Sequence, residues 1–314
     1  MASPPRLDAY HFYEREWADY RELAEEFEWE IPETFNIASY VCDRWADDGD
    51  RVAIFAESGD GDRRTYTFRE VRDVTNRLAN FLREEGIERG DRVAVNTPQS
   101  PETVFAHVAI WKLGAVSVPM STLFGPDALE YRLADCDVRA VVVDESNVEA
   151  LRAIEGSVDS LETVLTVGVA DREADERDLY SAIDGHSTQF DPVETRAEEN
   201  AIILYTSGTT GDPKGVVHAH RSLLGFLPTI VTTVGNGEVR PDDVFWSPSE
   251  WAWIGTLFLV VFPPLFYGNP TVAYDAGKFD PEEAFELIDR YGVTNFFAPP
   301  TALRMMMQVE KPGA

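Results

Sequence analysis

The sequence contains very little cysteine, and this scarcity excludes two classes of protein. Only Cys42 and Cys136 occur in 314 residues, and neither belongs to a Cys-x-x-Cys pair or stands at metal-ligand spacing from a histidine. A disulfide-stapled secreted domain and a cysteine-based zinc site are therefore excluded. The first residues are acidic and aromatic rather than basic and apolar, so no secretory leader is expected. We expect both thiols to be small buried groups in a reducing cytoplasm.

Lysine is also scarce, whereas acidic residues are abundant. The 27 basic residues include only four lysines, and 56 acidic residues bring the formal net charge to −29. Such an excess of carboxylates resembles halophilic proteins, whose surfaces need salt to screen their self-repulsion; an ordinary acidic enzyme is the alternative. No basic face for nucleic acid is visible. Residues 1–200 carry 24 of the 29 excess negative charges, which leaves residues 201–314 nearly neutral.

No apolar run is long enough to span a bilayer. The longest, Ile254 to Gly268, is interrupted by Pro263 and Pro264. It is shorter than the roughly 20 residues that a transmembrane helix needs, so we predict that it is buried core.

Strand-like and helix-like segments alternate along the chain and indicate an α/β fold with mostly parallel strands. The predicted helices are 35–45, 68–85, 101–112, 126–135 and one that Asp280 caps and Gly292 ends. The predicted strands are 52–55, 65–67, 92–96, 140–143, 201–204, 216–217, 294–297 and one into which the segment 113–119 turns.

Three regions follow from this pattern. Residues 1–35 are predicted to form an arm that lies on the body, 36–190 a first α/β subdomain, and 191–314 a second. The charged run Asp171–Asp178 is interpreted as a solvated loop near the boundary.

The most informative motif is the run from Tyr205 to Gly215. It includes four hydroxyl side chains and two glycines that are candidate phosphate ligands, namely Thr206, Ser207, Gly208, Thr209, Thr210 and Gly211, and then Lys214. Glycines let backbone N–H groups approach a ligand, hydroxyls add short donors, and lysine adds a positive charge. The apolar residues on both sides predict strand, loop and strand. A plain turn is the alternative, and the spacing does not fit the Walker pattern of P-loop kinases and GTPases.

This run resembles the phosphate-binding signature of the adenylate-forming (AMP-binding) superfamily almost letter for letter. The segments 110–119, 243–253 and 297–301 resemble further stretches of the same family, and the likeness covers roughly residues 35–314. Within the family, the closest resemblance is to acetyl- and medium-chain acyl-CoA synthetases. The resemblance implies the stacked mixed and parallel sheets with flanking helices of the large N-terminal domain of these enzymes.

The resemblance also implies a reaction and roles for individual residues. A carboxylate attacks the α-phosphorus of ATP to give an acyl-adenylate, and the thiol of coenzyme A then displaces AMP. Residues 206–211 and Lys214 would hold the β- and γ-phosphates, with Mg²⁺ bridging phosphate oxygens and Lys214 stabilising charge as a candidate catalytic group. Trp253 would border the acyl group in the substrate pocket. His218 and His220 are interpreted as structural, and no metal ligand of the chain itself is predicted.

Family members are considerably longer, and their adenine motif, magnesium carboxylate, ribose aspartate and catalytic lysine do not appear in these residues. The chain therefore resembles the N-terminal part only, and we expect little or no adenylation from it alone. The missing motifs would lie on a continuation or an adjacent reading frame. An adenylate-forming ligase with another acceptor, such as a carrier-protein thiol, and a non-catalytic nucleotide-binding fragment remain alternatives. Participation in fatty acid metabolism is an expectation of the same resemblance.

Overall fold

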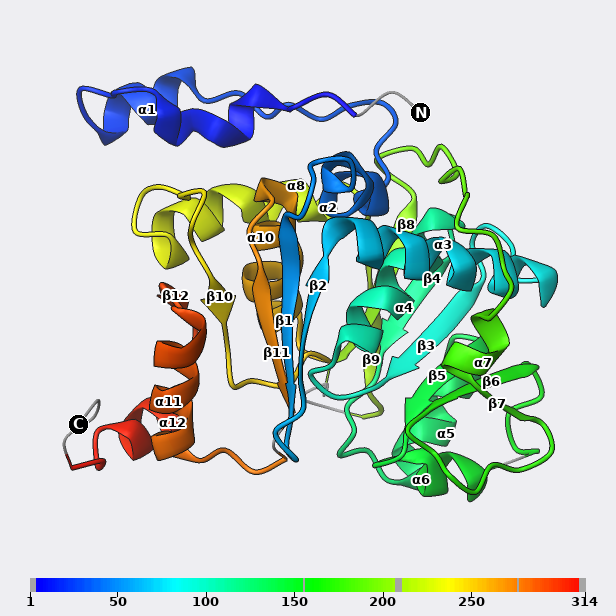
Figure 1. Ribbon diagram of the computed structural model, residues 1–314. Helices are drawn as coiled ribbons and strands as arrows, with labels where there is room; N and C mark the ends of the chain where they lie inside the picture. Colours follow the sequence, from blue (N-terminus) through cyan, green and yellow to red (C-terminus); the bar gives the residue numbers. More distant parts are fainter. Residues whose placement is uncertain (1–3, 155, 207–210, 276, 311–314) are drawn as a thin grey trace.

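The computed structural model describes residues 4–154, 156–206, 211–275 and 277–310. Two sheets stand side by side, with helices packed between and around them (Figure 1). The larger sheet has the strand order β7-β6-β5-β3-β4-β8-β9, and the smaller has the order β12-β10-β11-β1-β2. The predicted α/β class, with mixed and parallel sheets and flanking helices, is confirmed.

All neighbours in the seven-stranded sheet are parallel except β8 and β9. The buried apolar strand predicted at 140–143 is the centre of β5. The strands are β3 (Arg92–Asn96), β4 (Val116–Pro119), β5 (Val138–Asp144), β6 (Thr163–Val167), β7 (Glu176–Asp178), β8 (Asn200–Thr206) and β9 (Lys214–Ala219).

The five-stranded sheet joins distant parts of the chain. Strand β1 pairs in parallel with β11, so that Ile54 lies opposite Thr271. Each sheet therefore draws strands from both sides of residue 190, and the expected subdomain boundary does not coincide with the division between the sheets. The strands are β1 (Val52–Ser58), β2 (Arg63–Thr67), β10 (Phe245–Trp246), β11 (Thr271–Asp275) and β12 (Asn295–Phe296).

Local signals in the sequence explain where several helices begin. Thr67 and Glu70 form a reciprocal capping box at the start of α3. Asp280 accepts hydrogen bonds from the backbone of Glu282 and Glu283 at the start of α11, as predicted. The α-helices are α1 (Tyr20–Glu26), α2 (Ile37–Val41), α3 (Phe68–Glu84), α4 (Pro101–Lys112), α5 (Pro126–Asp135), α6 (Val148–Arg152), α7 (Leu179–Ile183), α8 (Ser222–Thr229), α9 (Ile254–Thr256), α10 (Phe262–Tyr267), α11 (Pro281–Tyr291) and α12 (Pro300–Met306). The 3-10 helices are η1 (Asp8–Glu14) and η2 (Asp43–Trp45), and Ile230–Val234 and Leu257–Val261 are π-helical.

Helix α4 connects the cores of the two sheets. Its residues Phe105 and Trp111 belong to the cluster that contains Phe262 of α10, whereas Ala109 and Ile110 belong to the cluster under β3 and β5. The predicted apolar core segment 254–268 is confirmed, because it forms α9, a π-helical turn and α10, and most of its side chains are buried.

Residues 4–35, from the segment expected to form an arm, contribute no strand to either sheet. Helices η1 and α1 lie along the top of the molecule (Figure 1). The hydroxyl of Tyr267 donates to the carbonyl of Tyr10 at 2.9 Å, and the rings of Tyr10 and Phe266 meet edge to face. Aromatic packing therefore fixes the arm to the end of α10.

The structure also tests the expectations for the charged run 171–178, for the two cysteines and for membrane-spanning helices. Part of the charged run is strand β7 rather than loop, because it pairs in parallel with β6, and the carboxylate of Glu176 accepts from Arg152 at 2.7 Å. Cys42 is buried as predicted, but Cys136 is only half-buried, and its thiol donates to the carbonyl of Arg132 at 3.0 Å. Within the described ranges, no helix has the length and apolar character needed to cross a membrane.

Candidate functional site

The two strands predicted on either side of the phosphate motif are confirmed as an antiparallel pair. Strands β8 and β9 pair with Tyr205 opposite Gly215 and Thr206 opposite Lys214. Thr206 and Lys214 are exposed at the two strand ends, so both side chains can reach a ligand from solvent. Ser207, Gly208, Thr209 and Thr210 lie outside the described residues. We call residues 205–215 the phosphate hairpin.

Two glycines of the hairpin are required by its geometry. Gly211 has a φ of +92°, a conformation that side-chain-bearing residues rarely adopt. A Cβ at Gly215 would lie 2.9 Å from Cγ2 of Ile203 and 3.3 Å from Cζ of Tyr205. Gly215 therefore leaves the space across which the Tyr205 ring lies.

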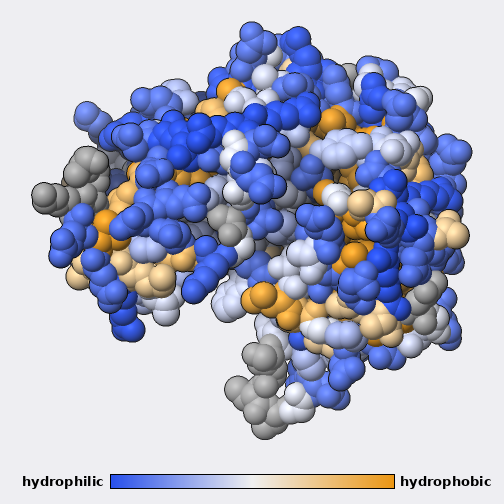
Figure 2. Space-filling view, turned by 60° about the horizontal axis from the view of Figure 1, so that its bottom comes forward, coloured by the Kyte–Doolittle hydropathy of each residue, from blue (hydrophilic) through white to orange (hydrophobic). Residues whose placement is uncertain are grey.

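The hairpin stands at the edge where the parallel strands of its sheet end. Because β8 is parallel to β4, and β4 to β3, the segments that follow these strands meet at one edge, the lower edge in Figure 1. Ligands of open α/β sheets bind at the carboxyl ends of the strands. Figure 2 brings this edge forward and shows mostly hydrophilic surface with smaller apolar patches.

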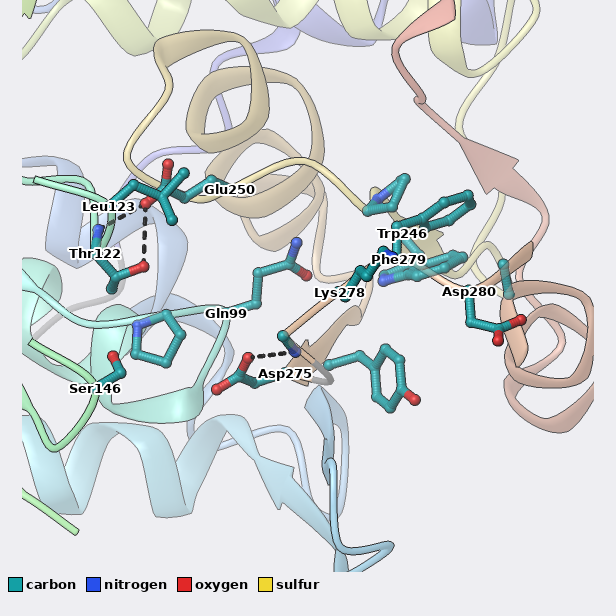
Figure 3. A pocket seen from close by; sticks show the side chains of 15 residues that line it. Gln99, Thr122, Leu123, Ser146, Trp246, Glu250, Asp275, Lys278, Phe279 and Asp280 are labelled. Atoms are coloured by element: carbon teal, nitrogen blue, oxygen red, sulfur yellow. Dashed lines mark hydrogen bonds between the residues drawn. The ribbon is translucent and has the colours of Figure 1, made fainter. Parts of the chain in front are cut away.

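A cavity of about 570 Å³ opens between the strand ends of the two sheets (Figure 3). One side is supplied by residues that follow β3, β4 and β5, and the other by residues of β10 and β11 and those that follow them. The lining residues are Pro98, Gln99, Thr122, Leu123, Ser146, Trp246, Pro248, Glu250, Tyr274, Asp275, Gly277, Lys278, Phe279, Asp280 and Ala284. We call this space the inter-sheet cavity; its size suits a small organic ligand.

Hydrogen bonds fix the two walls of the inter-sheet cavity to each other. The carboxylate of Glu250 accepts from the backbone N–H of Thr122 and from the hydroxyl of Ser121, both at 2.8 Å. The side-chain amide of Gln99 donates to the carbonyl of Ser249 at 2.7 Å. The segment after β10 is therefore held against the ends of β3 and β4.

The charge inside the cavity is mixed. Among its described lining residues, Lys278 alone is basic, whereas Glu250, Asp275 and Asp280 are acidic. Burial raises the pKa of Asp275, and the nearby carboxylate of Asp144 raises it further. Strand ends of opposite sheets thus bring like charges together, and a cationic or hydrogen-bonding ligand group would relieve this repulsion.

The predicted pocket residue Trp253 lies at the start of α9 and does not line the cavity. Its side chain is 68% exposed, whereas Trp251, two residues earlier, is buried. The role of Trp253 beside an acyl group stays a prediction. Sequence reasoning missed Gln99, Glu250 and Lys278. The available signal was that each of the first two follows a strand end, where functional polar residues gather.

The two histidines near the hairpin have little to do with proton transfer at physiological pH. His220 is fully buried, accepts a hydrogen bond from the backbone N–H of Ile37 at 3.3 Å, and has its pKa lowered to about 4 by burial. Burial also lowers the pKa of His218. The contact with Ile37 gives His220 a structural role between β9 and α2.

No group of three or more histidine, cysteine, aspartate or glutamate side chains in the described part of the chain is arranged to hold a metal ion. These residues therefore do not form a carboxylate cage for magnesium.

The sequence of this chain is similar to those of known enzymes. The family model described as AMP-binding enzyme matches residues 42–314. An acetyl-coenzyme A synthetase of Streptomyces coelicolor is 33% identical across 93% of this chain and 48% of its own length. A mitochondrial acyl-coenzyme A synthetase of Mus musculus is 30% identical across 93% of this chain and 51% of its own.

Solved structures show the same likeness. The crystal structure of a Brucella canis acyl-CoA synthetase has a TM-score of 0.79 at 32% identity and covers 88% of this chain and 50% of the other. An anthranilate CoA ligase in complex with anthranoyl-AMP has a TM-score of 0.82 at 26% identity, covering 90% of this chain and 53% of the other. The chain thus spans about half the length of the relatives it matches.

Proposed function

We propose that the chain contains the phosphate-binding part of an AMP-forming acid–thiol ligase, because it belongs to the AMP-binding enzyme family. The substrates would be a carboxylic acid, ATP with its magnesium ion, and coenzyme A. The relatives named acetyl- and acyl-coenzyme A synthetases support this assignment at 30–33% identity. The single observation that carries it is the phosphate hairpin, which stands at the carboxyl ends of the parallel strands.

The reaction asks for positioning and charge stabilisation more than for a base. A carboxylate is already nucleophilic, so it can attack the α-phosphorus directly while pyrophosphate departs. Thr206, Ser207, Gly208, Thr209, Thr210 and Gly211 would hold the β- and γ-phosphates, and the ammonium of Lys214 would stabilise the charge of the leaving group. Lys214 is exposed at the start of β9, where it can approach such a ligand.

The inter-sheet cavity is the proposed place for the remaining substrate groups. It lies between the strand ends that flank the hairpin, and hydrogen bonds from Gln99 and to Glu250 hold its walls. Trp253 stands on the same segment as Glu250 and its ring is exposed, so it is kept as the candidate for contact with the acyl group.

The direct test is carboxylate-dependent exchange of labelled pyrophosphate into ATP. Acetate, propionate, butyrate and octanoate are offered in turn to the 314-residue chain and to a version extended by any continuation in the gene. We expect exchange from the extended protein and much less from the chain alone. Lack of exchange by both, with every acid, would contradict the ligase assignment.

Two further assays separate the alternatives. Consumption of the free thiol of coenzyme A by the extended protein identifies the acceptor; if exchange occurs without thiol consumption, the acceptor is another thiol. Binding of ATP measured by calorimetry, with no exchange under any condition, would favour a nucleotide-binding module.

We also propose that the missing family motifs are encoded on a continuation or an adjacent reading frame. The observation behind this proposal is that the chain spans only 48–51% of its relatives. Sequencing the DNA beyond codon 314 tests it, and a downstream region without these motifs would overturn it.

We further propose, from the acidic composition, that the protein works at high salt in the cytoplasm. A net charge of −29 creates self-repulsion that salt screens. Thermal unfolding should therefore shift upward as potassium chloride rises into the molar range. A flat or falling trend would contradict this proposal.

A further inference from the structure

A single helix holds the phosphate hairpin at both of its ends. At the β9 end, the hydroxyl of Tyr131 on α5 donates to the carbonyl of Pro213 at 3.0 Å. At the β8 end, the hydroxyl of Tyr205 donates to Oδ2 of Asp135, the last residue of α5, at 2.6 Å. The two tyrosine rings meet edge to face with their centroids 6.4 Å apart. Both limbs of the hairpin are thus joined to α5.

The Tyr205 side chain reaches α5 because Gly215 leaves room for it. Tyr205 lies directly opposite Gly215 in the β8–β9 register, and a Cβ there would approach the ring to 3.3 Å. The same hydroxyl lies 3.3 Å from the carbonyl of Arg132. The hydroxyl–carboxylate bond is charge-assisted, and such bonds are stronger than neutral ones.

A loop that grips phosphates works only when its donors already point at the ligand. Disorder in the free loop would have to be removed on binding, and that ordering lowers affinity. Preorganised donors are held by residues outside the first layer of contacts. The α5 contacts are placed where they can supply this, because they fix Tyr205 on one limb of the hairpin and Pro213 on the other.

We propose that Tyr131, Asp135 and Tyr205 are positioning residues that hold the phosphate hairpin in its binding geometry. They act through the hairpin rather than by contact with the nucleotide. This inference rests on the proposed function of the hairpin and adds to it that the grip depends on α5.

The test compares phenol deletions on the two sheets. Tyr205→Phe and Tyr131→Phe each remove one hydroxyl and keep the ring, and Asp135→Asn removes the charge of the acceptor. Tyr291→Phe is the matched control, because the Tyr291 hydroxyl also donates to a carboxylate, that of Glu57 at 2.7 Å, but on the five-stranded sheet. Binding of Mg-ATP and of Mg-pyrophosphate is measured by calorimetry, with thermal unfolding as the check on folding.

We expect the dissociation constants of the hairpin variants to rise about five- to tenfold, the loss typical of one hydrogen bond. Tyr291→Phe should leave them unchanged. A second readout is trypsin cleavage after Lys214, followed by mass spectrometry. Cleavage should be faster in Tyr205→Phe and Tyr131→Phe, and Mg-ATP should protect them less than the parent chain.

The outcomes separate the two proposals. If the parent chain binds neither ligand, the proposed function of the hairpin fails and the inference fails with it. If the parent chain binds, but Tyr205→Phe and Tyr131→Phe match Tyr291→Phe within twofold in affinity and cleavage rate, the hairpin function stands and the role of α5 is overturned. Should Tyr205→Phe fail to fold, Tyr131→Phe decides alone.

Discussion

The carboxyl-end edges of the two sheets are built differently. The seven-stranded sheet presents the phosphate hairpin, a local structure whose ends are fixed by one neighbouring helix. The five-stranded sheet pairs β1 with β11 and so depends on contacts between residues far apart in the chain. On the proposed function, the phosphate hairpin of the first edge binds the phosphates, whereas the pairing of β1 with β11 behind the second edge stabilises the fold.

Glu57 is the clearest example of the second kind of edge. It lies at the end of β1, is 6% exposed, and accepts hydrogen bonds from Arg290 at 2.8 and 3.0 Å and from Tyr291 at 2.7 Å. Burial alone would raise its pKa, but the hydrogen bonds from Tyr291 and Arg63 and the charge of Arg290 lower it below its usual value. The buried carboxylate therefore ties α11 to β1.

Glu57→Ala should have the largest effect on stability and little effect on binding. Removing one partner of a buried ion pair costs about 3 kcal/mol or more, because the remaining charges lose their compensation. Urea unfolding measures the loss. Glu286→Ala is the control, since Glu286 is an exposed partner of Arg290, and its removal should cost less than about 0.5 kcal/mol. Equal losses in both variants would remove the distinction between the edges.

A pH titration should probe the helix between the sheets. His107 of α4 is fully buried against Trp111 and Phe262, and burial lowers its pKa to about 3. In the unfolded chain this imidazole is protonated below about pH 6.5, whereas in the folded chain it stays neutral. The free energy of unfolding therefore has its full value above that pH and decreases below it. We expect a loss on the order of 2 kcal/mol per buried histidine between pH 6.5 and 5.

His220 contributes with the same sign, because its pKa is also lowered, to about 4. His11 adds to this effect, because burial lowers its pKa to about 4 as well. Urea unfolding at pH 7 and pH 5 measures the sum of the three, and His107→Leu should reduce the slope by roughly a third. Glu57 does not interfere, since a carboxylate with a lowered pKa stays ionised throughout this window. An unchanged slope in His107→Leu would show that His107 is protonated in the folded protein.

Glycine substitutions should produce a smaller effect, of opposite sign at two sites. Gly215→Ala introduces a Cβ 2.9 Å from Ile203, so we expect a loss of about 1–2 kcal/mol and weaker binding of Mg-pyrophosphate. Gly225→Ala places its Cβ in open space within α8, where alanine is favoured over glycine by up to about 1 kcal/mol. Thermal unfolding of both variants checks the prediction, and a stabilised Gly215→Ala would refute the packing of Tyr205 over Gly215.

The sequence predicted local elements well where they carry their own signals. Helices 101–112 and 126–135 match α4 and α5, because a proline at the first position marks each start. The phosphate hairpin was predicted from its glycines, hydroxyls and flanking apolar residues. Strand β7 was missed, because its charged residues resemble a loop and are satisfied only by tertiary contacts such as that between Glu176 and Arg152.

Pairing between distant strands could not be predicted from one sequence. The partnership of β1 with β11 depends on packing across the whole core, and no local pattern encodes it. The same is true of the inter-sheet cavity, since Gln99, Glu250 and Lys278 come together only when both sheets are in place. Residues in one motif could be proposed as a site, whereas residues from several strand ends could not.

Competition for the phosphate hairpin tests most directly whether it binds the β- and γ-phosphates of ATP. Calorimetry measures binding of Mg-ATP to the 314-residue chain alone, with saturating Mg-pyrophosphate, and with AMP at the same concentration. We expect pyrophosphate to abolish ATP binding, whereas AMP should change the apparent dissociation constant less than twofold. Displacement of ATP by AMP but not by pyrophosphate would contradict this expectation.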